Sequence, residues 1–415
     1  MQWTYALLAA LLVSIFATAW PADVVDTTTI RGKVYCGYQG WFRCPGDGAD
    51  LKWIHWSRGQ QPPSATTMTV DMWPDMSEYG PDERYPVPGF TYPDGAPATL
   101  FSSCNSRTVL RHFEWMRDYG IDGIFLQRFV VGLRGAPLPW YYPSVLKVMN
   151  NVRRAAKETG RVWAISYDIA AMPGEDLYEV LTADWKHLVD RKLTEDPRYL
   201  HEGGKPVVQI WGFYKGIASH QLDLELARRL IRFFKQPGPY QACFVAGGDW
   251  NWREWPAEWR DLVAQCDVYS PWNIGNWRRD EAGHAHASTS WWKDDLTACQ
   301  GAGVLWFPTV YPGFTWDNLT QKPPGTSKID REGGHFLWEQ FYELARLGVD
   351  TVYVAMFDEV DEGTAVFKVT SSPPTQAYFV GYDGLPSDWY LRLVGEGQKM
   401  LRGERPPTPD LPFAP

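Results

Sequence analysis

Four carboxylates occupy five positions in the segment MFDEVDEGTAVF, directly after an apolar run: Asp358, Glu359, Asp361 and Glu362. In an extended strand, residues three apart face opposite sides, but a helical turn makes them neighbours. Gly363 permits such a turn, because glycine tolerates backbone angles that other residues resist. Glu359 and Glu362 can then share a pocket in which the charge of one keeps the other protonated. Such a pair supplies the general acid and base that cleave a glycosidic bond.

Two other interpretations of this acidic segment remain open. It can be a solvated loop, because acids with shifted pKa values also occur in structural networks. It can also bind a hard cation such as Ca²⁺, although the spacing does not match an EF-hand loop. We expect no metal and no cofactor. His284 and His286 lack a nearby third ligand, so we expect them in an exposed loop rather than in a metal site.

Residues suited to binding sugars follow the other apolar runs. Aromatic rings cover the C–H face of a sugar and polar groups bond its hydroxyls, and the chain contains 23 Trp. His55, in KWIHW, is a further candidate for ligand contact. The predicted substrate-binding residues are Tyr38, Trp41, Gln127, Arg128, Tyr167, Asp168, Trp211, Asp249, Trp250, Trp272, Asn273, Tyr311 and Asp358.

The residues that could do chemistry lie at the ends of short apolar runs rich in Val, Ile and aromatic residues. Continuous apolar runs are typical of strands that are buried on both faces, as in parallel sheets. Eight strands are predicted, at residues 33–42, 121–129, 161–169, 205–213, 241–249, 266–274, 303–311 and 350–359.

Amphipathic segments follow these runs and predict helices. They cover residues 107–119, 143–159, 177–192, 221–234, 257–264, 289–298, 335–347 and 387–401. Eight strands, each followed by a helix, make an α/β fold of the (β/α)₈ TIM barrel type the simplest closed arrangement. Catalytic groups of this fold lie at the C-terminal ends of the strands, where the acidic segment is expected.

The domain is expected to span residues 23–404, with a long loop insertion at 43–104 after the first strand and a short hairpin near 68–73. Residues 405–415 contain five prolines and are expected to form an extended tail. Residues 1–19 are predicted to be a signal peptide with the cleavage motif Ala17-Thr18-Ala19. The apolar run 5–20 falls short of the about 20 residues of a membrane span, although a signal anchor is an alternative.

We therefore expect a secreted or periplasmic protein without a membrane span in its mature chain. The formal net charge is −9 and no run of Lys or Arg occurs, which argues against nucleic-acid binding. Six cysteines are compatible with an oxidising compartment, and a disulfide between Cys44 and Cys104 is expected.

The segment from Phe357 to Thr364, FDEVDEGT, resembles the last-strand motif of glycoside hydrolase family 99, the endo-α-mannosidases and endo-α-mannanases. That motif runs aromatic-Asn-Glu-Trp-x-Glu-Gly-Thr. GYQGWF at 37–42, followed by PGDG at 45–48, resembles a bacterial subgroup between family 99 and family 71, the α-1,3-glucanases. The sequence departs from the motif at Asp358, which replaces Asn, at Val360, which replaces Trp, and at Asp361, which adds a charge.

The resemblance implies a (β/α)₈ barrel and retaining hydrolysis of an α-glycoside within a chain. It implies that Glu359 draws a proton from the sugar 2-hydroxyl, which attacks the anomeric carbon to give a 1,2-anhydro sugar. It implies that Glu362 protonates the leaving oxygen and later activates water. These roles predict a secreted, endo-acting, retaining α-glycoside hydrolase of the α-mannan or α-glucan type, whose partner is an oligo- or polysaccharide. The alternatives are a catalytically inactive carbohydrate-binding barrel and a calcium-stabilised scaffold.

Overall fold

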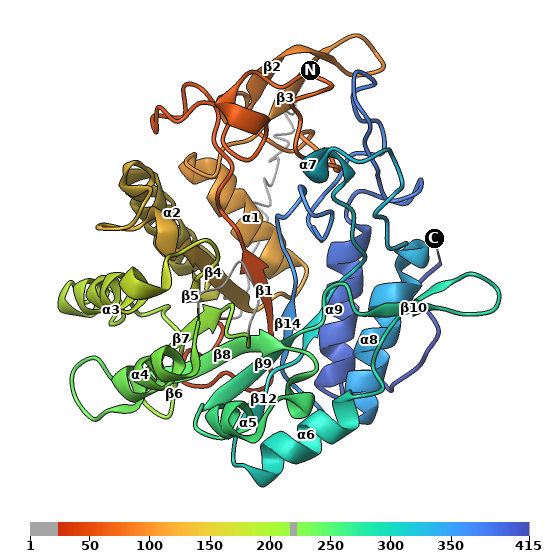
Figure 1. Ribbon diagram of the computed structural model, residues 1–415. Coiled ribbons are helices and arrows are strands. Elements are labelled where there is room, and N and C mark those ends of the chain that lie inside the picture. The colour runs from red at the N-terminus through yellow and green to blue at the C-terminus, as the bar shows by residue number, and fades with distance from the viewer. Residues whose placement is uncertain (1–23, 216–221, 415) are drawn as a thin grey trace, which may run out of the picture.

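The computed structural model describes residues 24–215 and 222–414, and the predicted signal peptide at 1–19 lies outside them. Figure 1 shows a parallel sheet enclosed by helices. Within the described residues, the parallel strands are β1 (Val34–Tyr38), β4 (Gly123–Phe129), β5 (Val162–Asp168), β7 (Lys205–Trp211), β8 (Cys243–Asp249), β9 (Val268–Trp272), β12 (Leu305–Trp306), β13 (Thr309–Val310) and β14 (Val352–Val354). All eight predicted strand segments therefore contain observed strands.

The predicted seventh strand closes the ring. The strand order is β12-β9-β8-β7-β5-β4-β1-β14-β13, and the two ends of this path, β12 and β13, come from the single segment 305–310. β12 pairs with β9, and β13 pairs with β14. Between them, the amide of Phe307 donates to Tyr269 and the carbonyl of Pro308 accepts from Tyr353. The expected barrel is therefore confirmed, with its seventh strand shared between two neighbours.

The predicted helices are also confirmed within a few residues at each end. They are α1 (Ser106–Asp118), α2 (Tyr142–Thr159), α3 (Gly174–Asp190), α4 (Leu224–Lys235), α5 (Ala257–Val263), α6 (Trp292–Gly301), α8 (His335–Arg346) and α9 (Trp389–Leu401). A further short helix, α7 (Asp317–Thr320), lies between β13 and α8. Side-chain caps fix two of the starts: Asn105 accepts from the amide of Arg107, and Asp223 accepts from that of Leu226.

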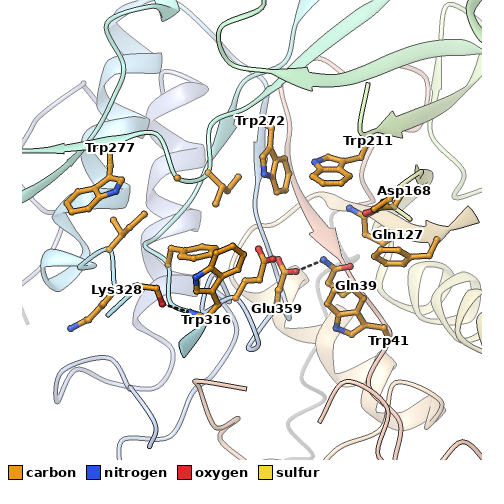
Figure 2. A pocket seen from close by; sticks show the side chains of 18 of the residues that line it. Gln39, Trp41, Gln127, Asp168, Trp211, Trp272, Trp277, Trp316, Lys328 and Glu359 are labelled. Carbon is orange, nitrogen blue, oxygen red and sulfur yellow. Dashed lines mark hydrogen bonds between the residues drawn. The ribbon is translucent and has the colours of Figure 1, made fainter. Parts of the chain in front are cut away.

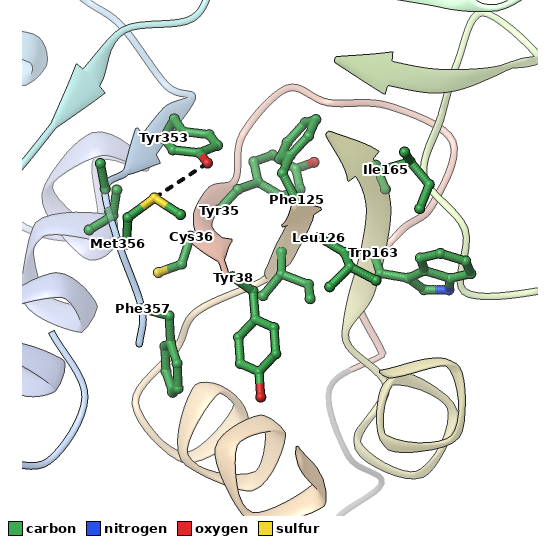
Figure 3. Close-up of a cluster of buried hydrophobic side chains, with 14 of the residues drawn as sticks. Tyr35, Cys36, Tyr38, Phe125, Leu126, Trp163, Ile165, Tyr353, Met356 and Phe357 are labelled. Atoms are coloured by element: carbon green, nitrogen blue, oxygen red, sulfur yellow. Dashed lines mark hydrogen bonds between the residues drawn. The ribbon is translucent and has the colours of Figure 1, made fainter. Parts of the chain in front are cut away.

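Large aromatic side chains fill the barrel where the strands converge (Figure 3). Tyr35 makes edge-to-face contacts with Phe125 and Phe307, with ring centroids 5.4 and 5.9 Å apart. Tyr353 packs against the same two phenylalanines at 5.8 and 5.9 Å. Such pairs stabilise beyond their buried area, so this layer gives the strand ends a rigid support.

The insertion after β1 lies over the C-terminal ends of the strands. The hairpin predicted near 68–73 is wrong, because this segment bonds to the acidic segment instead: the amides of Asp71 and Met72 both donate to the carbonyl of Val360. The hairpin of the insertion is β2 (Tyr85–Thr91) with β3 (Pro97–Leu100). Figure 1 shows this hairpin above the end of β1.

The remaining expectations concern the tail, the cysteines and membrane spans. Residues 405–414 form no helix or strand and pack on α8 and α9, where Trp338 donates to Thr408 and Phe413 contacts Trp389. All six cysteines are buried free thiols, so the disulfide expected between Cys44 and Cys104 is wrong; the Cys44 thiol donates to a carbonyl instead. Across the described parts of the chain, no helix has the length and apolar character of a membrane span.

Candidate active site

A cavity of about 660 Å³ opens at the C-terminal ends of the barrel strands. Its lining comes from the ends of β1, β4, β5, β7 and β9, from residues 274–277, from the loop 314–329 and from the acidic segment (Figure 2). The lining residues are Gln39, Trp41, Gln127, Phe129, Asp168, Ala170, Trp211, Trp272, Ile274, Gly275, Trp277, Phe314, Trp316, Thr326, Ser327, Lys328, Ile329, Glu359 and Glu362.

The acidic segment turns as soon as it leaves the sheet. β14 ends at Val354, and the amides of Thr364 and Ala365 both donate to the carbonyl of Glu359. Gly363 has φ of 59°, and a Cβ at that position would lie 2.9 Å from the backbone of Thr315, so a side chain would not fit. Through this turn Glu359 and Glu362 both line the cavity.

Two hydrogen-bond donors hold the carboxylate of Glu359, which is 4% exposed. Gln39 donates from Nε2 to Oε1 over 2.7 Å, and Thr364 donates from its hydroxyl to Oε2 over 3.0 Å. Burial raises the pKa of Glu359 well above its ordinary value, and the charges of Glu362 and Asp361 raise it further. The donors favour the ionised carboxylate, whereas burial and the neighbouring acids favour the protonated one.

Two further carboxyl groups titrate near neutrality beside Glu359. Burial, with the charge of Asp361, raises the pKa of Glu362 to about 7. Burial, opposed by a hydrogen bond from the amide of Ala170, raises the pKa of Asp168 to about 7, and the charge of Glu362 contributes to the rise. The cavity can therefore hold a protonated acid beside an ionised one at neutral pH, as general acid–base catalysis requires.

Aromatic rings wall the cavity on both sides of Glu359 (Figure 2). Trp41 is sandwiched between His55, at 3.8 Å and 8° between ring planes, and Phe129, at 5.1 Å and 28°. Trp211 and Trp272 meet edge to face at 5.4 Å. Trp277 and Trp316 lie on the side of Glu359 away from Trp41.

Three polar atoms of cavity-lining residues are buried without a hydrogen-bond partner in the described structure: Oε1 of Gln39, Oε1 of Gln127 and Nε1 of Trp41. A buried polar atom without a partner costs about 1–3 kcal/mol. Two acceptors and one donor around a cavity walled by aromatic rings match a ligand that combines hydroxyl groups with apolar C–H faces, such as a sugar.

The structure brings seven of the predicted site residues together at the cavity, namely Trp41, Gln127, Asp168, Trp211, Trp272, Glu359 and Glu362. It places three of the others on the helix-facing side of their strands. Tyr38 bonds His112 at 2.8 Å. Arg128 bonds Asp184 through two contacts of 2.7 Å, and the Tyr167 hydroxyl donates to the same carboxylate over 2.7 Å. These three are corrected to structural residues, because successive strand residues face opposite sides.

Asp358 is also a structural residue, because it is fully buried and outside the lining. Its Oδ1 accepts from the amide of Gln39 over 2.7 Å and its Oδ2 accepts from the amide of Gly40 over 2.9 Å. Burial raises the pKa of Asp358 to about 7. Asp358 thus fixes the backbone that carries Gln39, and it acts on the cavity through that residue.

Four more predicted residues lie near the strand ends but outside the lining. Asp249 is bonded by the amides of the turn that follows it, and Trp250 packs on Trp291 at 4.6 Å. Asn273 accepts from the side-chain amide of Asn276. Tyr311 is fully buried and its hydroxyl donates to the carbonyl of Asn276. Local turns and packing use these side chains, and the structure does not bring them to the cavity.

Sequence reasoning missed several lining residues, among them Gln39, Phe129, Trp277 and Trp316. Alternation along the first and second strands could have found Gln39 and Phe129, since each neighbours a predicted residue that faces the helices. Trp277 and Trp316 lie outside the barrel strands, and composition alone did not single them out. His55 contacts the site only indirectly, through Trp41 and through a 3.5 Å approach to Asp361.

Comparison with known proteins reveals similarity at the level of fold. No protein-family model matches the chain, and no curated protein matches it. Among solved structures, the chain is similar to the GH99 endo-alpha-mannosidase from Bacteroides thetaiotaomicron in complex with bis-tris-propane, with a TM-score of 0.64 and 14% identity over 91% of this chain and 99% of that one. The chain is also similar to a second structure of that enzyme, with a TM-score of 0.64 and 15% identity over 90% of this chain and 99% of that one.

A glycoside hydrolase-like protein is also similar, with a TM-score of 0.52 and 12% identity over 91% of this chain and 97% of that one. At these identities the similarity establishes a shared fold, the (β/α)₈ barrel that the resemblance implied.

Within the described residues, no group of three or more His, Cys, Asp or Glu side chains is arranged to hold a metal ion.

Proposed function

We propose that this protein is a secreted, endo-acting, retaining hydrolase of α-linked glycans of the α-mannan or α-glucan type. The observation that supports this most strongly is that Glu359 and Glu362 share one aromatic-walled cavity and that the charge of Glu362 raises the pKa of Glu359. The fold shared with an endo-alpha-mannosidase gives independent support. The export of the protein rests on the signal peptide predicted from residues 1–19.

In the proposed reaction, Glu359 is the base. Its carboxylate is held by Gln39 and Thr364 and takes the proton of the sugar 2-hydroxyl. The 2-oxygen then attacks the anomeric carbon as the bond to the leaving oxygen breaks. Glu362, which keeps its proton below its pKa of about 7, gives that proton to the leaving oxygen. A 1,2-anhydro sugar and a shortened chain result.

In the second step the roles reverse. Glu362, now ionised, takes a proton from water, and the hydroxide formed opens the anhydro ring at the anomeric carbon. The proton on Glu359 returns to the 2-oxygen, so both carboxyl groups recover their starting states. Two displacements at the same carbon retain its configuration. The first requires a 2-hydroxyl trans to the leaving group, which α-mannosides have and α-glucosides lack, so this mechanism applies only to substrates of the α-mannan type.

Endo-action is supported by the position of the acids within the cavity. Trp277 and Trp316 lie on one side of Glu359, and Gln127 and Trp41 lie on the other (Figure 2). A glycan bound across the carboxyl groups would then contact protein on both sides of the cleaved bond. Interior bonds of a chain fit such a site better than terminal ones.

The test is hydrolysis of α-mannans of different linkage and of α-1,3-glucan by the purified protein. Glu359→Gln and Glu362→Gln are expected to lower kcat by about 10²- to 10⁴-fold. Glu258→Gln, on the exposed face of α5, is the matched control and should retain wild-type activity. Equal turnover by wild type and by Glu362→Gln would refute the assignment, and an inverted anomer in the product would refute the mechanism.

A second candidate function is a catalytically inactive carbohydrate-binding barrel. It is favoured by the crowding of acids, since Asp168, Asp361 and Glu362 all have pKa values raised to about 7 and none is paired with Lys or Arg in the described structure. A site whose acids are all protonated binds hydroxyls but lacks a base. Calorimetry with the same glycans separates the two functions, because this candidate predicts binding without products.

A further inference from the structure

A short hairpin forms the outer wall of the cavity beyond Trp272. It consists of β10 (Trp277–Arg279) and β11 (Ala285–Ala287), and it projects from the barrel beside α8 (Figure 1). Trp277 lines the cavity, and its partner across the hairpin is Ala287. Both histidines were expected in an exposed loop: His284 lies in the exposed loop before β11, whereas His286 lies in the middle of β11 and is half-buried.

The hairpin has its own small core, separate from that of the barrel. Ala285 and Ala287 are buried together with Tyr311, Ile329 and Phe336, and Trp277, Ile274 and Phe314 pack against this cluster. Four of these eight residues, namely Ile274, Trp277, Phe314 and Ile329, also line the cavity. This cluster therefore supports the cavity wall on this side.

Two glutamates fasten the outer edge of β11, one from α8 and one from the short 3-10 turn Glu332–Gly334 that precedes it. Glu339 accepts from the amide of Ala287 over 2.7 Å through one oxygen, and from Nδ1 of His286 over 2.7 Å through the other. Glu332 makes the same pair of contacts two residues earlier along the strand. One of its oxygens accepts from the amide of Ala285 over 2.8 Å, and the other lies 3.2 Å from Nδ1 of His284. Each carboxylate thus holds one backbone amide and the imidazole of the preceding residue.

His286 bonds carboxylates through both ring nitrogens. Nδ1 faces Glu339, and Nε2 lies 3.3 Å from Oδ2 of Asp280, in the hairpin turn. An ionised carboxylate only accepts hydrogen bonds, and only the imidazolium carries a proton on both nitrogens. Both contacts therefore require His286 to be protonated. The remaining charged neighbour is Arg278, opposite His286 on β10, which opposes that protonation.

We propose that the β10–β11 hairpin is the wall of a second saccharide subsite, distal to the carboxyl pair, in which Trp277 stacks on a sugar ring and which protonated His286 fastens to α8. This inference rests on the proposed function, because it assigns a further sugar of the same glycan to the site. Arg279 packs at 4.9 Å over the Trp277 ring and holds its orientation. Trp316, on the neighbouring loop, completes the aromatic wall.

The charge on His286 gives the subsite a pH dependence of defined sign. Hydrogen bonds to Glu339 and Asp280 raise the pKa of His286. We call these two hydrogen bonds of His286, to Glu339 and to Asp280, the clamp. The pKa of His286 is higher when the clamp is formed. The clamp is therefore complete below the ordinary histidine pKa of about 6.5 and is lost as the pH rises through the raised pKa. When the clamp is lost, glycans long enough to reach Trp277 should bind more weakly. The binding of short glycans should not change with the clamp.

The experiment compares short and long oligosaccharides prepared from the glycan that the wild type cleaves or, failing cleavage, binds in calorimetry. Trp277→Ala is expected to raise KM or Kd for a hexasaccharide roughly tenfold and to raise that for the shortest substrate by much less. Trp277→Phe should recover most of the loss, which guards against a folding defect. An unchanged preference for long glycans in Trp277→Ala would overturn the subsite.

The clamp is tested by the pH dependence of that preference, between about pH 5.5 and about pH 8.5. In the wild type the preference for long glycans should decline with rising pH. Glu339→Gln should flatten the decline, because its amide can donate to neutral His286 while its oxygen still accepts from Ala287. His187→Gln on α3 is the control, and its preference for long glycans should change with pH as that of the wild type does. A wild-type preference that does not change with pH would overturn the clamp.

The outcomes separate this inference from the proposed function. If the wild type neither cleaves nor binds any of the glycans, the proposed function fails and the inference fails with it. If the wild type cleaves them but Trp277→Ala treats short and long chains as wild type does, only the inference fails.

Discussion

Nε2 of Gln39 donates a 2.7 Å hydrogen bond to Oε1 of Glu359, and so ties the end of the first barrel strand to the end of the last. The Thr364 hydroxyl holds the other oxygen of the same carboxylate. In the proposed mechanism Glu359 must be ionised at the start, although burial and two neighbouring acids oppose this. The two donors are the groups that favour the charged form and fix its direction.

Removing the Gln39 side chain should therefore impair catalysis. A hydrogen bond to a charged group contributes about 1.5–3 kcal/mol, so Gln39→Ala is expected to lower kcat/KM by about 10- to 100-fold. Gln300→Ala, on the exposed face of α6, should leave kcat/KM unchanged. Steady-state kinetics measure both, and wild-type kcat/KM in Gln39→Ala would show that Glu359 does not depend on this bond.

The charge of Asp361 should set the upper limit of the pH range of activity. Activity should fall as the pH rises above about 7, where Glu362 loses the proton that it must donate. The Asp361 charge helps to raise the pKa of both Glu362 and Glu359. Asp361→Asn should lower these pKa values and move the alkaline limb of the profile of kcat/KM to lower pH.

The control for this shift is Asp261→Asn, which removes an equal charge from the exposed face of α5. Its pH profile should coincide with that of the wild type. An alkaline limb that stays in place in Asp361→Asn, or moves to higher pH, would mean that Glu362 is not the group that limits activity at high pH.

The strands and helices were predictable because the barrel buries them in a repeating way. β5 is buried at all seven positions, and a strand buried on both faces appears in the sequence as a continuous apolar run. The break in the seventh strand was not predicted, although Pro308 lacks the amide that a continuous ladder needs. Its cause is tertiary, because two different neighbours pair with the two halves.

The site was only half predictable, for two different reasons. At strand ends the sequence indicates suitable residue types, but type alone does not separate Arg128 and Tyr167, which face the helices, from their cavity-facing neighbours Gln127 and Asp168. Trp277 is different, because a separate hairpin core places it and nothing local in its sequence reports that position. The hairpin predicted near 68–73 failed likewise, since its amides bond to the acidic segment.

Asp358 offers a test of why this chain has a carboxylate where the resembled motif has an amide. Two backbone amides, those of Gln39 and Gly40, donate to its two oxygens. An asparagine has one acceptor oxygen, so its NH₂ group would face one of these donors. Asp358→Asn should lower the free energy of unfolding by about 1–3 kcal/mol and should also lower kcat, because Gln39 loses its support.

Urea unfolding monitored by Trp fluorescence measures the first effect, at a pH above the Asp358 pKa of about 7 so that the carboxylate is the reference. The exposed Asp261→Asn serves again as the control. If Asp358→Asn is as stable and as active as the wild type, the two amides do not need a carboxylate.

The buried pair of Arg128 and Asp184 gives the last prediction, which concerns stability and not catalysis. The guanidinium makes two contacts of 2.7 Å with the carboxylate, and the side chains are 1% and 5% exposed. Tyr167 donates to the same carboxylate, so β4, β5 and α3 are joined there. Asp184→Asn leaves a buried guanidinium without its counter-ion and should cost about 3–5 kcal/mol of unfolding free energy.

The matched control is the pair of Arg232 with Glu225 on α4, at 2.8 Å but 60% and 64% exposed. Water screens such a pair, so Glu225→Gln should cost less than about 1 kcal/mol. Denaturant unfolding compares the two variants directly. Because Arg128 and Tyr167 face the helices and not the cavity, folded Asp184→Asn should keep kcat/KM within about twofold of wild type. The contrary outcome is that Asp184→Asn lowers the free energy of unfolding no more than Glu225→Gln does and also causes a large loss of kcat/KM. That outcome would return Arg128 to the substrate-binding role expected from the sequence.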